Sequence, residues 1–404
     1  MSEFIDYLVK NKVIADGSFS IVDVGARAGY QDSWDRYGDF VSIFGFEPDL
    51  QECQRVNEQS SLRNRKCFPN AISNADKSEI FYSARFPACS GLLKADIDYI
   101  RRYGFIDTLE STEECEIECI SLDSWAVENS IQKIDFLKVD VEGAELSILK
   151  GADSLLENII ACDVETWIAP AHIEQADVGK LISYMHKKGF QTFDMELHRH
   201  KKTCLPESLH TFNESRGQLI WSQTLFIRDP VREIQRGSSF WTKENIVKSL
   251  MVFSKYNYLD SAIEVVIVAY DNGILDEKDR DDYLDVLTPC LSNGVKVCYV
   301  EYMAVRVLEL LHFYIRVLDK DNFFPEGFLL NFKEELSVDV MCGLLGLYNF
   351  IDENSEIKSV DTWEKAFCER YFFNYKEYFS SFETLLSKGI LNFDGERFQL
   401  EARR

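Results

Sequence analysis

The sequence predicts an α/β fold, with an open sheet in the first 230 residues and an α-helical domain after residue 240. Before residue 230, short apolar runs that end at glycines or acids alternate with amphipathic segments, as in sheets with crossover helices. After residue 241, apolar residues recur at helical spacing, as at Ile246, Leu250 and Phe253, and strand signals nearly vanish. A chain of 404 residues usually forms two domains, which we place at 1–230 and 240–404.

The first element is residues 21–29, IVDVGARAG, which predict a buried strand that stops at a glycine turn. Gly25 and Gly29 have no Cβ, so a ligand can approach the backbone closely there. Arg27 occupies the position where a dinucleotide fingerprint has its second glycine, which favours a smaller, nucleoside-like ligand. Taken singly, either glycine could equally mark a turn that binds nothing.

The second strand, residues 41–46, ends in Glu47, about twenty positions after Gly25. In doubly wound nucleotide sites an acid at roughly this offset binds the ribose hydroxyls. Together with Asp23 inside the first strand, this pattern predicts a nucleoside-binding half-sheet. We expect a helix over 49–62, a short strand and loop over 67–73, and strands over 79–84 and 115–122. Residues 86–93 should form an ordered loop, and a helix should begin at residue 123.

Residues 134–151, IDFLKVDVEGAELSILKG, predict a strand that ends at Asp140, a turn at Gly143 and a helix. Open α/β sheets bind ligands beyond the carboxyl ends of their strands. We therefore expect Asp140, Glu142 and Glu145 near the mouth of the cleft that Gly25 begins. A structural role is the alternative for the two glutamates, because acids in a first helical turn favour the helix dipole.

The next strand, residues 159–165, ends in Glu165, and a loop with Trp167 and His172 follows. A helix over 177–188 and strands over 190–194 and 219–227 should complete the sheet. His172 is a candidate general base because histidine titrates near neutrality, although a lone loop histidine is often only hydrogen-bonded. Asp140 with Glu165 could hold Mg²⁺, which we do not favour because no dense ligand motif is present.

The run HRHKKTC, residues 198–204, has histidine and cysteine spacings that match no closed zinc site, so a solvated basic hairpin is the preferred interpretation. The net charge of −24 and a pI near 4.7 oppose non-specific attraction to nucleic acid or anionic membranes. No stretch approaches the roughly 20 apolar residues of a membrane helix. The start of the chain lacks the basic residues of a signal peptide, and the 11 cysteines form no C-x-x-C pairs. We expect a cytoplasmic protein with reduced thiols.

Four motifs, VDVGARAG at 22–29, FEPD at 46–49, ISLD at 120–123 and KVDVEGAELSILKGA at 138–152, resemble those of the FkbM family of S-adenosylmethionine-dependent methyltransferases. The resemblance spans residues 15–230. It implies a Rossmann-like class I methyltransferase sheet of seven strands whose last strand is antiparallel. It also implies S-adenosylmethionine as the cofactor and an oxygen as the methyl acceptor.

The resemblance also implies a set of site residues. Asp23, Gly25 and Gly29 would surround the amino-acid end of the cofactor, Glu47 its ribose, and the segment around Ala71 its adenine. Asp140 would lie at the methyl-transfer site, with Glu165 and His172 as further catalytic candidates. The full cofactor-binding set is Asp23, Gly25, Ala26, Arg27, Gly29, Glu47, Pro48, Asn70, Ala71, Ile72 and Asp140. Arg27 stands where family members often have Asn.

The sequence thus predicts an O-methyltransferase that acts on a hydroxyl of a carbohydrate or glycosylated metabolite. Its partner would be a small molecule or glycan, and the helical domain would shape the acceptor site or form a homo-oligomer. The alternative is a scaffold that keeps the cofactor fold without turnover and recruits a protein through its helical half. Methylation of nucleic acid lacks the basic surface that phosphate binding needs.

Overall fold

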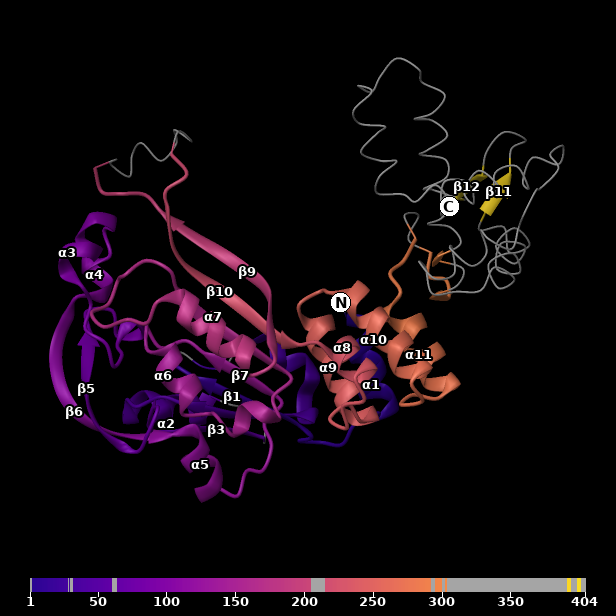
Figure 1. Ribbon diagram of the computed structural model, residues 1–404, viewed down its shortest axis with the longest axis horizontal. Helices are drawn as coiled ribbons and strands as arrows, with labels where there is room; N and C mark the ends of the chain where they lie inside the picture. The colour runs from indigo at the N-terminus through magenta and orange to yellow at the C-terminus, as the bar shows by residue number, and fades with distance from the viewer. Residues whose placement is uncertain are drawn as a thin grey trace, which may run out of the picture. The chain divides into compact units, whose positions relative to one another are not determined.

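The computed structural model describes residues 2–27, 29, 32–59, 64–204, 215–291, 295–299, 302–303, 391–393 and 398–400. The chain divides into two compact units, Met1–Tyr258 and Leu259–Arg404 (Figure 1). No helix within the described residues is long and apolar enough to cross a membrane.

A seven-stranded sheet forms the centre of the first unit. Its order is β3 (Arg65–Phe68), β2 (Val41–Phe46), β1 (Phe19–Val24), β7 (Phe136–Val139), β8 (Ala161–Trp167), β10 (Gln218–Arg228) and β9 (Phe190–His200). The pairs from β3 to β8 are parallel, and β10 is antiparallel to both β8 and β9. The predicted fold class is confirmed, including the antiparallel last strand.

Helices cover both faces of this sheet. On one face, α5 (Leu122–Glu128), α6 (Glu145–Lys150) and α7 (Val178–Lys187) bury side chains such as Trp125 and Leu149 against alternate strand residues such as Val22. The other face carries η1 (Asp32–Phe40), whose Trp34 packs on Phe19 and Phe136. The unit also contains α1 (Ser2–Asn11), α2 (Leu50–Gln59), η4 (Leu155–Glu157), α8 (Pro230–Gln235) and α9 (Lys243–Lys255).

A second sheet, of three strands in the order β4 (Ala71–Ser73), β6 (Ser111–Ser121) and β5 (Lys77–Ala84), was not predicted. The sequence suggested one short strand and a loop over 67–73, but the chain leaves the main sheet after Phe68 and enters the second sheet at Ala71. Pro69 lies between them and has no N–H to donate to a ladder. Between β5 and β6 the chain forms η2 (Pro87–Cys89), α3 (Ile97–Ile100), η3 (Arg101–Tyr103) and α4 (Ile106–Leu109).

Buried polar contacts join α9 to the sheet. Lys248, which is 2% exposed, donates to both carboxylate oxygens of Asp135 at 3.1 Å, and Asp135 also accepts from the N–H of Ser20 at 2.8 Å. The hydroxyl of Tyr256 donates to Asp163 on β8 at 2.7 Å. The unit that holds the sheet therefore extends to Tyr258, and the division into functional domains near residues 230–240 stays a prediction.

In the second unit, α10 (Leu259–Asp271) and α11 (Glu277–Leu287) are helical, and β11 (Leu391–Phe393) pairs antiparallel with β12 (Phe398–Leu400). The helical character expected after residue 241 is present in these two helices and in α9. The segments predicted as helical at 305–318 and 342–350 lie outside the described residues.

Candidate cofactor and methyl-transfer site

The chain turns that follow β1, β2 and β7 are fastened together at one edge of the main sheet. The N–H groups of Gly25 and Ala26 donate to the carbonyl of Phe46 at 3.2 and 3.0 Å. The N–H of Asp140 donates to the carbonyl of Val24 at 3.0 Å. Gly25 has φ +92°, and a Cβ there would overlap the carbonyl oxygen of Asp140. Only glycine allows β1 and β7 to end in such close contact.

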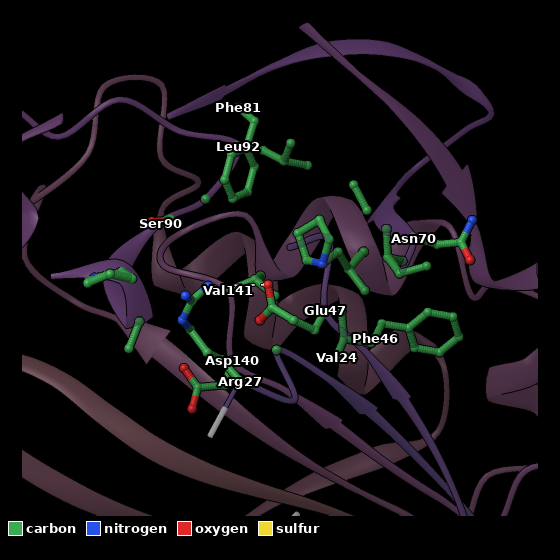
Figure 2. Close-up of a pocket in the computed structure, with 18 of the residues that line it drawn as sticks. Val24, Arg27, Phe46, Glu47, Asn70, Phe81, Ser90, Leu92, Asp140 and Val141 are labelled. Atoms are coloured by element: carbon green, nitrogen blue, oxygen red, sulfur yellow. Dashed lines mark hydrogen bonds and ion pairs between the residues drawn. The ribbon is translucent and has the colours of Figure 1, made fainter. Parts of the chain in front are cut away.

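A cavity of about 190 Å³ opens at this edge (Figure 2). Eight predicted cofactor-site residues line it: Gly25, Arg27, Glu47, Pro48, Asn70, Ala71, Ile72 and Asp140. Among the described residues, the lining does not include Asp23, Ala26, Gly29, Glu165 or His172. Side chains from the tips of β2 and β7, which are far apart in the sequence, thus meet around one hollow.

Glu47 forms a buried acidic part of the wall. Burial raises its pKa, although the N–H of Asp49 donates to its Oε1 at 2.9 Å. One guanidinium nitrogen of Arg27 lies 3.4 Å from the same oxygen, and the other terminal nitrogen lies 3.2 Å from Oδ2 of Asp49. The arginine that departs from the family pattern therefore adds positive charge beside the carboxylate expected to bind ribose.

Lys138 is a cavity residue to which the sequence analysis gave no role. Its Nζ lies 3.2 Å from Asp23 and 3.5 Å from Asp140. Burial alone would lower the pKa of Lys138, but the two carboxylates raise it above its ordinary value. A lysine inside a buried strand, two residues before an acid at the strand end, was the signal available in the sequence.

Asp23 lies behind the cavity wall rather than in it. It is 4% exposed, and its register partner across β1 and β7 is Lys138, to which its Oδ1 is hydrogen-bonded. Burial raises the pKa of Asp23, and the charge of Lys138 opposes that rise. The structure therefore connects Asp23 to Asp140 through the lysine.

Near the tips of β7 and β8, Glu145 and Glu165 are buried and Glu142 is half-buried. Glu145 accepts from the N–H of Gly143 at 2.8 Å, and burial raises its pKa to about 7. Burial and the charge of Asp140 raise the pKa of Glu142 to about 8. Glu165 accepts from the indole N–H of Trp167 at 2.8 Å, and its pKa is also raised by burial.

His172 is 4% exposed, and its ring stands edge-on to Trp167 with the centroids 4.9 Å apart. Burial lowers its pKa to about 4, so the ring is neutral near pH 7. Because His172 and Glu165 are both enclosed outside the cavity lining, their catalytic assignment stays a prediction. Within the described ranges, no group of three or more His, Cys, Asp or Glu side chains is arranged to hold a metal ion.

The end of β5 and the loop that follows it form the opposite, mostly apolar wall. Phe81 and Leu92 lie across the hollow from Asp140 (Figure 2), and Ser90 lies beside them. The loop is fixed by a bridge between Tyr82 and Gly91. Sequence reasoning identified an ordered loop here but did not place it in the site, because nothing local shows that it folds back over the main sheet.

A seven-stranded sheet of this order, with a cavity at the tips of β1, β2 and β7, defines a Rossmann-like protein of the class that binds nucleoside cofactors. Residues 23–192 match the family model described as the methyltransferase FkbM domain. The chain thus carries an FkbM methyltransferase domain, and the predicted family is confirmed.

Two solved structures are similar to this chain. One, with 10% identity and a TM-score of 0.22, is a TehB-like SAM-dependent methyltransferase from Corynebacterium glutamicum ATCC 13032 Kitasato; the match covers 56% of this chain and 87% of that one. The other is EvdMO1, with 11% identity, a TM-score of 0.26, and coverage of 58% of this chain and 42% of that one. Among curated proteins no relative matches.

The cavity residues fit the cofactor of this family. Apolar side chains such as Ile72 and Phe46 suit an adenine ring, and Glu47 offers carboxylate oxygens to ribose hydroxyls. At the other end, Asp140 and Lys138 present opposite charges, which suits a cationic sulfonium and an amino-acid group.

Proposed function

We propose that this protein is an O-methyltransferase that uses S-adenosylmethionine to methylate a hydroxyl of a carbohydrate or glycosylated metabolite. The observation that carries the proposal is that Glu47 and Asp140, at the tips of β2 and β7, line the same cavity. One carboxylate is suited to hold the nucleoside and the other to face the reacting group.

The nucleoside end of the site depends on Glu47 and on the segment 70–72. Glu47 would accept hydrogen bonds from the ribose hydroxyls, while the charge of Arg27 opposes the rise in the pKa of Glu47 that burial causes. Ala71 and Ile72 would flank the base with small and apolar surfaces. The neighbouring Asn70 offers amide groups to the polar edge of the base.

The acceptor end depends on Asp140. S-adenosylmethionine, when bound, supplies a methyl group already activated by a sulfonium, so the protein needs mainly to orient the acceptor and take its proton. The Asp140 side chain is 38% exposed and can receive that proton at a carboxylate oxygen. The Nζ of Lys138 lies 3.5 Å from this carboxylate and forms an ion pair with it.

Two features support a carbohydrate acceptor. The wall opposite Asp140 combines the ring of Phe81 with the hydroxyl of Ser90. A sugar presents both an apolar face of C–H groups and polar hydroxyls, and aromatic rings pack on such faces. The strongly acidic chain, at −24, disfavours nucleic acid as the acceptor.

The test is transfer of radiolabelled methyl groups into sugar, lipid and protein fractions of an extract of the source cells. We expect incorporation into a sugar-containing fraction, and Asp140→Asn should reduce the rate by roughly 10²–10⁴-fold, as for loss of a general base. Asp16→Asn, which removes an exposed acid before β1, is the matched control and should leave the rate unchanged.

Calorimetric titration with S-adenosylmethionine accompanies the rate measurement. Asp140→Asn should lower the rate even when the cofactor is saturating, whereas Glu47→Gln should mainly weaken cofactor binding. If the parent protein binds the cofactor but labels no fraction, the scaffold interpretation replaces the enzyme.

A further inference from the structure

Two pairs of consecutive cations lie near one another where the chain leaves β9. Arg101 and Arg102 lie on η3, and Lys201 and Lys202 follow β9; we name these four residues the basic surface. The N–H of Thr203 donates to the carbonyl of Arg102 at 2.9 Å, which holds the two pairs together. In Figure 1, β9 and β10 run past the ends of the neighbouring strands toward this point.

Two of these cations, Arg102 and Lys202, lie over the ring of Tyr103. The guanidinium carbon of Arg102 lies 5.8 Å from the ring centroid of Tyr103, and the Nζ of Lys202 lies 5.6 Å from the same centroid. Arg102 also lies 5.5 Å from the ring of Tyr99. Cation–π contacts of this kind contribute only about 1 kcal/mol at exposed sites and do not neutralise the charges.

No ion pair with the basic surface is present in the part of the chain that the structure describes. Two acids on the adjacent helices, Asp98 on α3 and Asp107 on α4, are exposed and form no salt bridge with these cations. Surplus positive charge therefore gathers here in a chain whose acids outnumber its bases by 68 to 44. An anion placed between Arg102 and Lys202 would relieve their mutual repulsion.

The aromatic platform beneath the cations is rigid. Gln218 of β10 donates to the hydroxyl of Tyr99 at 2.9 Å and accepts from the hydroxyl of Tyr103. Tyr103 is 6% exposed and packs in a cluster with Trp167 and Ile220. A site whose supports are already fixed loses little conformational entropy when a ligand binds.

The same cluster connects the basic surface to the cofactor cavity. Cys89 packs against this cluster. It belongs to the loop whose residues 87, 88 and 90–92 line the cavity. Trp167 ends β8, at the same carboxyl edge of the sheet as Glu47 and Asp140. One continuous apolar support thus underlies both the basic surface and the wall opposite Asp140.

We propose that the basic surface binds the phosphate of a phosphorylated carbohydrate. As an anion site, it stands separately from the proposed function. A small ligand is favoured over a long polyanion because screening limits the attraction of the patch to about 8 Å, while the rest of an acidic chain repels extended polymers.

The test is calorimetric titration of the full chain with glucose 1-phosphate, and with glucose as the uncharged control. We expect glucose 1-phosphate to bind at least tenfold more tightly than glucose, and to bind more weakly as salt rises. Arg102→Gln with Lys202→Gln should weaken glucose 1-phosphate binding at least tenfold. The matched control is Lys180→Gln with Lys187→Gln, two exposed lysines on α7, which should change nothing.

The proposal is overturned if the parent protein binds glucose 1-phosphate no better than glucose, or if the Arg102 and Lys202 variant binds it as the parent does. It is also overturned if the two cations instead bind phosphatidylserine vesicles while glucose 1-phosphate fails to bind. A separate titration with S-adenosylmethionine should be unaffected by the variant. If the parent protein does not bind S-adenosylmethionine, the proposed function is contradicted, but the anion site is not.

Discussion

At the scale of single residues, Lys138 is the cation that pairs with two carboxylates of the site. It lies between Asp23 behind the wall and Asp140 inside the cavity. Removing one partner of a buried charged pair leaves the other uncompensated, so these three residues act as a unit. The sequence analysis assigned Asp23 and Asp140 to the cofactor but missed the lysine, because pairing across β1 and β7 cannot be read from either strand alone.

The buried glutamates predict a specific pH dependence of stability. The pKa values of Glu142 and Glu145 are raised by burial to about 8 and about 7, above their unfolded values near 4.3. The folded state then binds more protons than the unfolded state, so stability is lost as pH rises. Between pH 6.5 and 8 we expect the free energy of unfolding to fall, with a slope of up to about 1.4 kcal/mol per pH unit for each carboxyl that ionises.

The ionisation of His172 has the opposite effect on the free energy of unfolding, but it acts mainly below this pH range. Its pKa is lowered by burial to about 4, so the stability that it affects rises with pH only up to about 6.5. Urea unfolding at four pH values measures the slope. Glu142→Gln should flatten it, whereas Glu128→Gln, at an exposed position, should not. A parent protein whose stability rises across this window would contradict the assignment.

At the scale of elements, the contact between the tips of β1 and β7 sets the geometry of the site. Gly25→Ala would place a Cβ against the carbonyl of Asp140 at a φ of +92°. Strain and overlap together should cost about 3 kcal/mol or more of unfolding free energy, measured by urea denaturation. Gly29→Ala is the matched control, since its φ is +103° but no described atom lies within 4 Å of the added carbon.

Both variants strain the backbone, but only Gly25→Ala creates an overlap. The difference between their unfolding free energies therefore measures the cost of the overlap. Gly29→Ala should cost only about 1 kcal/mol. Equal losses for both variants would show that close approach of β1 to β7 is not what requires Gly25.

Most elements of the main sheet could be predicted from local pattern, and the reason is physical. Residues 41–46 and 219–227 are apolar runs bounded by acids or polar turns, and they form β2 and β10. The second sheet could not be predicted, because β4 and β6 pair over nearly fifty residues of chain and β6 is largely exposed. The strands over 79–84 and 115–122 were expected and correspond to β5 and β6, but the pattern within a segment does not say which distant segment it pairs with.

At the scale of the whole molecule, the division at Tyr258 predicts which fragment folds. Residues 1–258 should unfold cooperatively and bind S-adenosylmethionine, because they retain Lys248 and Tyr256 against the sheet. Residues 1–230 leave Asp135 buried without Lys248, which should cost at least about 3 kcal/mol. Circular dichroism with urea unfolding compares the two fragments.

A single substitution in the full chain separates this contact from the effects of truncation. Lys248→Met should itself lower the unfolding free energy by a similar amount. Equal stability of the fragments 1–230 and 1–258 would place the boundary where the sequence suggested, near residues 230–240.

The candidate site as a whole shows which part of it sequence can reveal. The motifs around Gly25, Glu47 and Asp140 identified one side of the cavity, since strand tips of a doubly wound sheet converge whatever the rest of the chain does. The side formed by Phe81, Ser90 and Leu92 depends on the tertiary folding of the second sheet, so no local sequence pattern predicts it.

That separation has a consequence for engineering. The nucleoside-facing side belongs largely to the parallel strands, while the wall opposite Asp140 is formed by the end of β5 and the segment that follows it, which the Tyr82–Gly91 bridge ties back to β5. We expect that such a segment could be exchanged between related methyltransferase domains. Chimeras with a grafted segment should retain cofactor affinity while accepting a different methyl acceptor.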